Sequence, residues 1–457
     1  MATVGVAIVG GGIAGLAAAY ELQRRGVSVQ VLEAAARVGG VISSDRFDGW
    51  VVDGGPDSML VQKPAAVALC RDLGLGDRLI HTLPPRTAYV MRAGQLHPLV
   101  EGSFLGFPLT AAGLIRSPIF SAAGKMRMAL EPFMPRRSGD EDESIGAFVR
   151  RRFGKEAVDY LAEPLLAGIH AGDVERLSIR ALFPRLVDAE HHAGSVLRAF
   201  RALRSRPSSN GAFVSLPGGT GELIDTLATA LDGTICLDVR VNALHRIGML
   251  RIETSRGPID ARAVILAVPA YVAGSLLRGF DTTLAAFCDA VPYASTATVA
   301  LGFRREHVAH PLAGTGFVVP RVERRGLLAA TWISSKWPGR APEGHVLLRG
   351  FLGGGRDPHR LDDSDQMLID TTRHELGALL GISAEPLFVR VYRFTKQSPQ
   401  YEVGHLERVA QIEQRLAAIP GVFVTGSGFR AIGIPDCVAD ARATAAIAAG
   451  YVSSASH

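Results

Sequence analysis

The stretch Val4-Gly-Val-Ala-Ile-Val-Gly-Gly-Gly-Ile-Ala-Gly15 decides how the chain is expected to fold. Its first part, Val4 to Val9, is a short continuous apolar run of the kind that forms a buried strand. Its second part, Gly10 to Gly15, fits the pattern G-x-G-x-x-G. An apolar helix is expected to follow and to stop at Gly26, which is a suitable C-terminal cap.

A second strand and an acidic residue complete this pattern. Val27 to Leu32 is the expected strand, and it leads directly to Glu33. In strand–helix–strand units of this kind the glycines let the backbone approach a pyrophosphate, and the helix N-terminus offers free N–H groups to its charge. The acid holds the adenosine ribose. Because an acid favours a ribose without a phosphate, FAD or NAD is expected rather than NADP.

Two further glycine segments indicate FAD. Arg37-Val-Gly-Gly40 follows Glu33 closely, and Gly54-Gly-Pro-Asp-Ser58 comes after a short hydrophobic hairpin. Both segments suit a long dinucleotide that lies extended across the fold. The arrangement resembles the FAD-containing amine-oxidase superfamily, which includes carotenoid desaturases, porphyrinogen oxidases and GDP-dissociation inhibitors.

Composition excludes several other classes of protein. The 457 residues are 47% hydrophobic and 20% charged, which excludes a disordered, collagen-like or coiled-coil chain. No apolar run reaches ~18 uninterrupted residues, so no membrane-spanning helix is expected. The net charge of +5 comes without a zinc-finger spacing, an RNP-like aromatic box or a sustained basic run, and no nucleic-acid partner is expected.

The cysteines and histidines predict neither a disulfide framework nor a metal site. The 4 cysteines are far apart and form no C-x-x-C pair. His307 and His310 have no carboxylate or third ligand at helical spacing beside them. The sequence shows no export signal. We therefore expect a cytoplasmic protein that binds no metal.

Three longer motifs narrow the resemblance to one family. They are Glu163-Pro-Leu-Leu-Ala-Gly-Ile-His-Ala-Gly-Asp173, Pro399-Gln-Tyr-Glu-Val-Gly-His-Leu-Glu-Arg408 and Gly426-Ser-Gly-Phe-Arg-Ala-Ile-Gly-Ile-Pro-Asp-Cys437. All three look like motifs of the oxygen-dependent protoporphyrinogen and coproporphyrinogen oxidase family. The match is spread along essentially the whole chain.

Two features point to different branches of that family. The segments Gly314-Thr-Gly-Phe-Val318 and Thr331 to Gly344 are similar to the Gram-positive, coproporphyrinogen-type enzymes. Arg86, however, falls where the protoporphyrinogen-type enzymes carry an arginine that anchors a propionate. The sequence does not decide between the two porphyrinogens.

The resemblance implies a mixed α/β fold with three units. A Rossmann-type FAD-binding domain is expected over residues 1–83, 212–290 and 420–457. An inserted mixed β-sheet substrate-binding domain is expected over residues 84–98 and 291–419, and a helical membrane-associating cap over residues 99–211. Apolar side chains next to Arg116 and Lys125 suit a one-leaflet membrane contact. An ordinary helical lid over the active site explains the same pattern.

The resemblance also assigns residues to the cofactor and the substrate. FAD contacts are expected from Gly10, Gly11, Gly12, Ile13, Ala14, Gly15, Glu33, Ala34, Arg37, Gly40, Val41, Gly55, Pro56, Asp57, Ser58, Val241, Ala267, Ile432, Gly433 and Ile434. For the substrate, Arg86 would hold a carboxylate, Gly168 would leave clearance for the macrocycle, and Trp332 and Phe351 would sandwich its rings. The alternatives are a surface arginine, a helix-packing glycine and two core aromatics.

The expected reaction is the six-electron oxidation of coproporphyrinogen III or protoporphyrinogen IX to its porphyrin in heme biosynthesis. The resemblance implies FAD as hydride acceptor, molecular oxygen as oxidant and hydrogen peroxide as by-product. No side chain stands out as a general base, which suits a reaction whose difficult step belongs to the cofactor.

Two alternatives stay open. One is a flavin amine oxidase or carotenoid desaturase on the same fold, although no lysine shows by its sequence context that it lies beside the flavin. The other is a non-enzymatic carrier, and the intact Glu33, Gly55 and Ile432-Gly-Ile434 elements argue against a lost flavin. A peripheral contact with the cytoplasmic face of the cell membrane and a contact with a downstream ferrochelatase are also left open.

Overall fold

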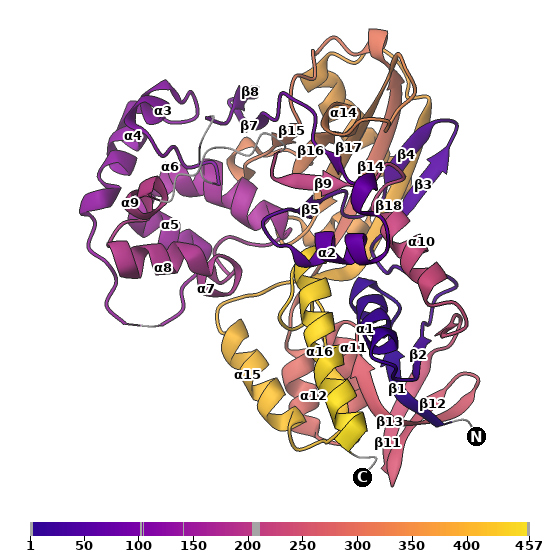
Figure 1. Ribbon diagram of the computed structural model, residues 1–457. Helices are drawn as coiled ribbons and strands as arrows, with labels where there is room; N and C mark the ends of the chain where they lie inside the picture. The colour runs from indigo at the N-terminus through magenta and orange to yellow at the C-terminus, as the bar shows by residue number, and fades with distance from the viewer. Residues whose placement is uncertain (1–2, 101–102, 104, 140, 203–210, 455–457) are drawn as a thin grey trace.

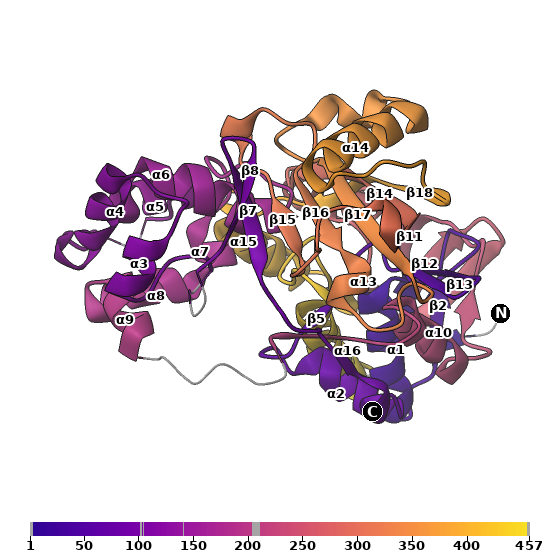
Figure 2. The ribbon, with the colours of Figure 1, turned by 90° about the horizontal axis from the view of Figure 1, so that it is seen from above.

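The structure is a computed structural model that describes residues 3–100, 103, 105–139, 141–202 and 211–454. Two large β-sheets with helices packed on them make up most of the molecule, and a unit made of helices lies to one side of both (Figure 1). The view from above shows the same separation, with the helices α3 to α9 set apart from the sheets (Figure 2).

The first sheet is assembled from three stretches that are far apart in the sequence. Its order is β10-β2-β1-β13-β12-β11, and β19 also pairs with β13. The strands are β1 (Thr3–Val9), β2 (Val29–Leu32), β10 (Ile235–Cys236), β11 (Val241–Ile247), β12 (Met249–Thr254), β13 (Gly257–Leu266) and β19 (Val422–Val424). β1 is parallel to β2 and β13, and β13 is parallel to β19. The carboxyl ends of these four strands therefore meet at one edge.

Helices cover both faces of this sheet. Along β1, Val6 and Ile8 belong to one hydrophobic core, whereas Ala7 and Val9 belong to another, as the alternation of a strand requires. The first core holds α1 (Ile13–Arg24), α2 (Ala65–Asp72), α10 (Gly221–Ala230) and α16 (Ile434–Ser454). The second holds α11 (Ala270–Leu277), α12 (Thr282–Asp289) and α15 (His405–Leu416).

The position of α15 differs from the expected domain boundary. We expected residues 291–419 in the substrate-binding domain, but Ile412 and Leu416 of α15 pack in the core under the first sheet. Arg415 also binds Asp281 at the start of α12, with Nη1 and Oδ2 2.7 Å apart. The apolar face of α15 therefore places this helix with the nucleotide-binding unit.

The second sheet joins residues 88–98 to residues 293–399. Its order is β18-β14-β17-β16-β15-β7-β8. The strands are β7 (Ala88–Arg92), β8 (Gln95–Pro98), β14 (Tyr293–Arg304), β15 (Gly316–Val318), β16 (Ala329–Trp332), β17 (His345–Gly353) and β18 (Phe388–Pro399). Helix α14 (Asp365–Leu380) contributes Leu368 and Leu376 to its core, and the short helix α13 (Ile333–Lys336) follows β16.

Smaller elements connect these parts. The hairpin of β3 (Ser44–Phe47) and β4 (Trp50–Asp53) packs against the second sheet, where the rings of Trp50 and Phe388 are 4.8 Å apart. Another small sheet has the order β5-β9-β6, with β5 (Met59–Leu60), β6 (Ile80–His81) and β9 (Phe213–Ser215). The 3-10 turns are η1 (Gly76–Arg78), η2 (Glu131–Phe133), η4 (Arg305–His307), η5 (Arg321–Glu323) and η6 (Pro358–Asp362).

The helical unit, called the cap below, has its own hydrophobic core, to which β7 of the second sheet adds Val90. Its helices are α3 (Ala111–Arg116), α4 (Ala122–Ala129), α5 (Ile145–Phe153), α6 (Lys155–Ala157), α7 (Ile179–Leu182), α8 (Pro184–Ala193), α9 (Val196–Ala202) and the π-helix η3 (Val158–Ala167). Pro164 inside η3 has no N–H to donate, so a regular α-helix cannot continue through it. The boundary that we expected at residue 211 follows residues 203–210, which lie outside the described residues.

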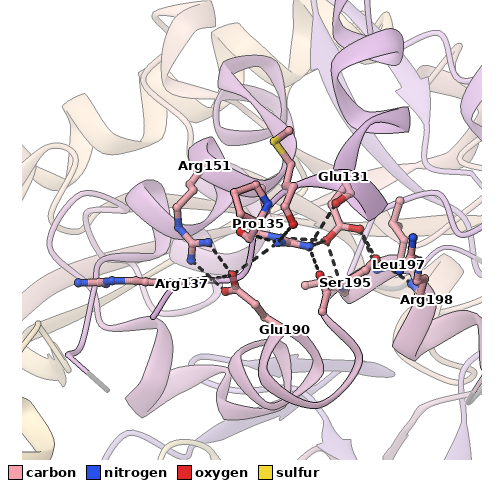
Figure 3. A network of polar contacts seen from close by, with 12 residues as sticks. Glu131, Pro135, Arg137, Arg151, Glu190, Ser195, Leu197 and Arg198 are labelled. Carbon is pink, nitrogen blue, oxygen red and sulfur yellow. Dashed lines mark hydrogen bonds and ion pairs between the residues drawn. The ribbon is translucent and has the colours of Figure 1, made fainter. Parts of the chain in front are cut away.

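A buried ionic network holds the cap together (Figure 3). Arg152 and Glu131 are both fully buried, and Nε of Arg152 donates to Oε1 of Glu131 at 2.9 Å. The Arg152 guanidinium also donates to the carbonyl oxygens of Met134 (3.0 Å) and Gly194 (2.9 Å). Glu131 in turn accepts the N–H of Val196 at the start of α9 (3.0 Å). One ion pair therefore ties α5, η2 and α9 together.

We compared the described helices with the length and apolarity that a membrane-spanning helix requires. None of them has both the length and the apolarity that a membrane-spanning helix requires.

We expect Arg152→Met to destabilise the chain by about 3–5 kcal/mol, because it leaves the Glu131 carboxylate buried without its cation. Arg150, two residues earlier, is the matched control, since its pair with Glu175 is half exposed. Arg150→Met should cost less than ~1 kcal/mol. Urea unfolding of both variants measures the difference, and equal losses would contradict the role given to the buried pair.

Candidate functional site

The loop between β1 and α1 has the geometry of a dinucleotide cradle. Gly10 has a φ of +104°, and a Cβ on it would lie 2.5 Å from the carbonyl oxygen of Ala267. A Cβ on Gly15 would lie 1.9 Å from the carbonyl oxygen of Gly10, so the helix can approach the strand only through glycine. By contrast, a Cβ on Gly12 would meet no atom within 4 Å. The space in front of this loop is therefore open.

The N-terminus of α1 faces that open space. Gly12 is its N-cap, and no side chain caps the helix. The first N–H groups of a helix carry the positive end of its dipole and bind anions well. The loop and the helix together therefore offer a site for a phosphate or pyrophosphate.

Glu33 follows β2 and lies beside the same loop. Its Oε2 accepts the N–H of Gly11 (2.6 Å), and its Oε1 accepts the N–H of Ala35 (2.8 Å). The Glu33 carbonyl oxygen accepts the N–H of Val239, two residues before Val241 at the start of β11. The structure thus brings Glu33 close to the backbone of the Val241 strand.

The second glycine segment lies against the first. The N–H of Gly39 donates to the carbonyl oxygen of Gly11 (2.8 Å). Arg37 folds over its own loop, and its guanidinium donates to the carbonyl oxygens of Gly40 (2.8 Å) and Ile42 (3.2 Å). These hydrogen bonds show that Arg37 shapes the loop around Gly40 and Val41.

The strip of residues 54–58 approaches the segment 39–41. A Cβ on Gly55 would lie 2.0 Å from the carbonyl oxygen of Val41. Asp57 is 6% exposed, and both oxygens of its carboxylate lie 3.0 Å from Nζ of Lys336. Burial alone would raise the pKa of Asp57, but the charges of Lys336 and Arg349 outweigh burial and hold its pKa well below the usual range. Asp57 is therefore a carboxylate near pH 7.

A second buried carboxylate lies next to this group. Asp53 is 2% exposed and accepts the N–H of Thr220 (2.9 Å), and its Oδ2 lies 3.4 Å from Nη2 of Arg340. Nη1 of Arg349, on β17, donates to the carbonyl oxygens of Asp53 and Gly55 (both 2.7 Å). Three cations thus accompany two carboxylates at the junction of the two sheets.

The sequence patterns did not single out these three cations as parts of the site. Lys336 and Arg340 lie within the stretch Thr331 to Gly344 that resembles Gram-positive enzymes, and this stretch was the available signal. No lysine showed by its sequence context that it lies beside the flavin, but Lys336 contacts Asp57, one of the residues assigned to the cofactor.

The last segment of the site is the loop from β19 to α16. A Cβ on Gly426 would lie 3.3 Å from Cβ of Ala14 in α1, so this loop contacts the first helix. Ile432 and Gly433 lead into α16, which begins at Ile434. Near its start, Asp436 binds Lys63, with Oδ2 and Nζ 2.6 Å apart. Segments from both ends of the chain therefore converge on the carboxyl edge of the parallel strands, where α/β folds bind ligands.

The expected substrate residues occupy different environments. Arg86 is exposed, and its Nε donates to the carbonyl oxygen (3.1 Å) and hydroxyl (2.9 Å) of Thr82. Within the described part of the chain, its two terminal nitrogens have no partner. Gly168 is exposed at the end of η3. Phe351 is half-buried on β17 with the guanidinium of Arg349 4.8 Å from its ring centre.

Trp332, unlike Arg86, Gly168 and Phe351, has no exposed surface. It is fully buried, with ring centres of Tyr89 and His310 5.4 and 4.9 Å from its own. We expected it to face the macrocycle, but its ring is enclosed in the core of the second sheet and offers no open face. The alternative interpretation, a core aromatic, describes its position.

A comparison with known families agrees with this geometry. The model of the flavin containing amine oxidoreductase family matches residues 13–449. The chain belongs to this family. Its members bind a flavin, and the open cradle at Gly12 beside Glu33 fits FAD, which is the cofactor of the chain.

Relatives cover nearly the whole chain. A coproporphyrinogen III oxidase of Bacillus subtilis is 34% identical over 464 residues, which are 98% of each protein. A protoporphyrinogen oxidase of Arabidopsis thaliana is 29% identical and covers 99% of this chain and 95% of its own length. A solved structure from Exiguobacterium, provisionally named protoporphyrinogen oxidase, has a TM-score of 0.89 at 33% identity and covers 98% of this chain and 99% of its own.

A more distant solved structure shows a likeness of fold alone. Wild-type putrescine oxidase bound to putrescine has a TM-score of 0.69 at 17% identity and covers 98% of this chain and 99% of its own.

The open space at Gly12 gives a direct test of the cradle. In Gly12→Ala we expect unchanged stability of the chain without FAD, because the new Cβ meets nothing. We expect FAD affinity to fall by at least about tenfold, or ~1.4 kcal/mol, because the methyl group occupies the approach to the pyrophosphate. Fluorescence titration with FAD measures this. Gly450→Ala, also open but near the end of α16, is the control and should bind FAD normally.

Proposed function

We propose that the chain oxidises a porphyrinogen to a porphyrin in heme biosynthesis. The observation that carries this proposal is the 34% identity to a coproporphyrinogen III oxidase over 98% of both proteins. It is supported by the convergence of the cofactor segments with Phe351 and Lys336 at the junction of the two sheets. FAD, when bound, accepts electrons from the substrate two at a time. Three such two-electron steps account for the six electrons that the porphyrinogen loses. We propose that oxygen is the final electron acceptor.

The residues of the chain would bind and orient the reactants. The loop 10–15 and the start of α1 would hold the pyrophosphate, and Glu33 the ribose. Gly55 to Ser58 and Ile432 to Ile434 would flank the flavin ring. These assignments rest on the open cradle and on the close packing of the four segments.

Arg86, Gly168 and Phe351 remain in the proposed substrate site. Arg86 has terminal nitrogens that suit a propionate carboxylate, which binds arginine through paired hydrogen bonds. The backbone that leads to Arg86 contacts the cofactor side of the site, because the N–H of Leu83 donates to the carbonyl oxygen of Lys336 (2.9 Å). Trp332 is left out because it is enclosed in the core.

We further propose coproporphyrinogen III as the better substrate. The curated coproporphyrinogen III oxidases of Bacillus subtilis and Propionibacterium freudenreichii are 34% and 33% identical to the chain. The plant protoporphyrinogen oxidases are 27–30% identical.

The substrate proposal is tested by the initial rate of porphyrin fluorescence in air. We expect coproporphyrinogen III to react faster than protoporphyrinogen IX. Arg86→Ala should raise KM at least about tenfold with little change in kcat, since it removes binding rather than chemistry. Arg256→Ala, an exposed arginine in a hairpin of the first sheet, is the control. A flavin-loaded chain that oxidises amines and neither porphyrinogen would overturn the proposal.

We also propose that the cap makes a peripheral contact with a membrane. Ile115 (70% exposed), Met126 (67%) and Phe133 (75%) project from α3, α4 and η2. Nζ of Lys125 donates to the carbonyl oxygen of Ile115 (2.7 Å), so a cation lies within the same surface. Apolar side chains beside cations suit an anionic membrane surface, which we propose to be the cytoplasmic face of the cell membrane. A contact with a downstream ferrochelatase rests on the family resemblance alone, and we make no further proposal about it.

Vesicle sedimentation tests the membrane proposal. The double variant Ile115→Ser/Phe133→Ser should bind anionic vesicles at least about tenfold more weakly. Burying one large apolar side chain contributes ~1.5–3 kcal/mol of free energy, and this variant removes two of them. Ile447→Ser is the matched control, since Ile447 is 63% exposed on α16. Equal losses in both variants would show that this surface of the cap is not special.

A further inference from the structure

The segment between β18 and α15 is bound to the cap. The N–H of Ser178 donates to the carbonyl oxygen of Tyr401 (2.8 Å), and the N–H of Val403 donates to that of Arg176 (3.0 Å). The side chains of Arg176 and Glu402 add an ion pair of 2.9 Å. These contacts form an isolated antiparallel β-bridge, centred on Leu177 and Glu402, between the cap and residues 401–405, which we call the bridging segment.

The bridging segment is bound on its other side to the loop that precedes α16. The Tyr401 hydroxyl donates to the carbonyl oxygen of Ser427 (2.9 Å), and Nε2 of His405 pairs with the carbonyl oxygen of Phe429 (2.8 Å). The two rings stack with centres 3.7 Å apart and planes at 14°. Tyr401 is 4% exposed and His405 is fully buried. Both side chains therefore belong to a fixed interior contact.

The protonation state of His405 follows from its surroundings. A carbonyl oxygen only accepts, so Nε2 must carry the proton that it donates to Phe429. Burial lowers the pKa of His405 to about 4, so the ring is neutral near pH 7. Its Nδ1 is buried and has no donor among the described residues. The ring therefore has one strong directional contact, and that contact is to the loop.

The loop itself leads directly to the proposed flavin site. Asp440 of α16 holds one end of it, because its Oδ2 accepts the N–H of Gly426 (2.9 Å). Tyr401 and His405 hold its middle, three to five residues before Ile432. Gly433, next in the chain, has a φ of +86° and turns the backbone into α16. The position of the α16 N-terminus thus depends on the hydrogen bonds at 427 and 429.

We propose that Tyr401 and His405 are positioning residues that couple the cap to the flavin through the loop 426–433. This proposal rests on the proposed placement of FAD at the start of α16. The side chains of both residues contact the loop, and the backbone of Tyr401 and Val403 in the same segment contacts the cap. FAD that fixes the loop therefore also fixes the cap, in which Gly168 faces the proposed substrate. Because coupling between two sites is reciprocal, a porphyrinogen under the cap steadies the flavin in turn.

Hydrogen exchange of the full-length chain with and without saturating FAD tests the coupling. In the unaltered chain we expect FAD to slow exchange around Gly12, in the loop 426–433 and, by about fivefold, in the cap segment 174–183. In His405→Phe, which keeps the ring and removes the donor, protection at Gly12 should persist and protection of 174–183 should be lost. His405→Gln, which restores an N–H, should recover part of it.

Tyr401→Phe is the milder variant, since it removes one hydroxyl and should keep the fold. It should at least halve the protection of 174–183. Tyr89→Phe is its control, because it also removes a hydroxyl that donates to a carbonyl oxygen (Ala313, 2.8 Å) but lies in the second sheet. Protection of 174–183 that is equal in the unaltered chain, His405→Phe and Tyr401→Phe would overturn the proposal.

The same experiment separates this proposal from the proposed function. It needs FAD and no porphyrinogen, so a chain that oxidises no porphyrinogen can still show the coupling. FAD that protects Gly12 but leaves the loop 426–433 unchanged in the unaltered chain would overturn the placement of the flavin and the coupling with it.

Discussion

Arg349 fixes the relation between the two sheets. It lies on β17 of the second sheet, yet its guanidinium donates to the carbonyl oxygens of Asp53 and Gly55, which belong to the nucleotide-binding unit. A buried guanidinium is costly unless its N–H groups are paired, so the strip 53–57 and β17 must stay in contact. Everything placed at the junction depends on this contact, including the Asp57–Lys336 pair and the ring of Phe351.

The cap is attached to this framework in a different way. Its interior is held by its own apolar core and by the Arg152–Glu131 pair. The cap contacts the bridging segment through backbone hydrogen bonds and one largely exposed ion pair, Arg176–Glu402. The contacts between the cap and the second sheet are both apolar and polar, since Val90 of β7 lies in the cap core and Arg92 of the same strand forms an ion pair with Glu156 of α6.

Local sequence patterns predicted the nucleotide-binding elements well. The strand, glycine loop, helix, second strand and Glu33 are neighbours in the chain, and steric limits at Gly10 and Gly15 leave little freedom. Contacts between distant segments were beyond such patterns. Lys336 and Asp57 meet only because the two sheets pack together. No local sequence pattern around either residue predicts this contact. Trp332 and α15 were misplaced for the same reason, since burial is decided by the partner surface.

The order of the first sheet has a consequence for synthesis of the chain. β1 leaves the ribosome first, but its neighbour β13 begins at Gly257 and the strand beyond, β19, ends at Val424. At ~5–20 residues per second, the wait for β13 lasts roughly tens of seconds. During that time the apolar edge of β1 has no partner on this side. Sheets closed by such distant strands fold slowly, so we expect the unpaired strand edges of the nascent chain to be open to aggregation until β13 and β19 have emerged.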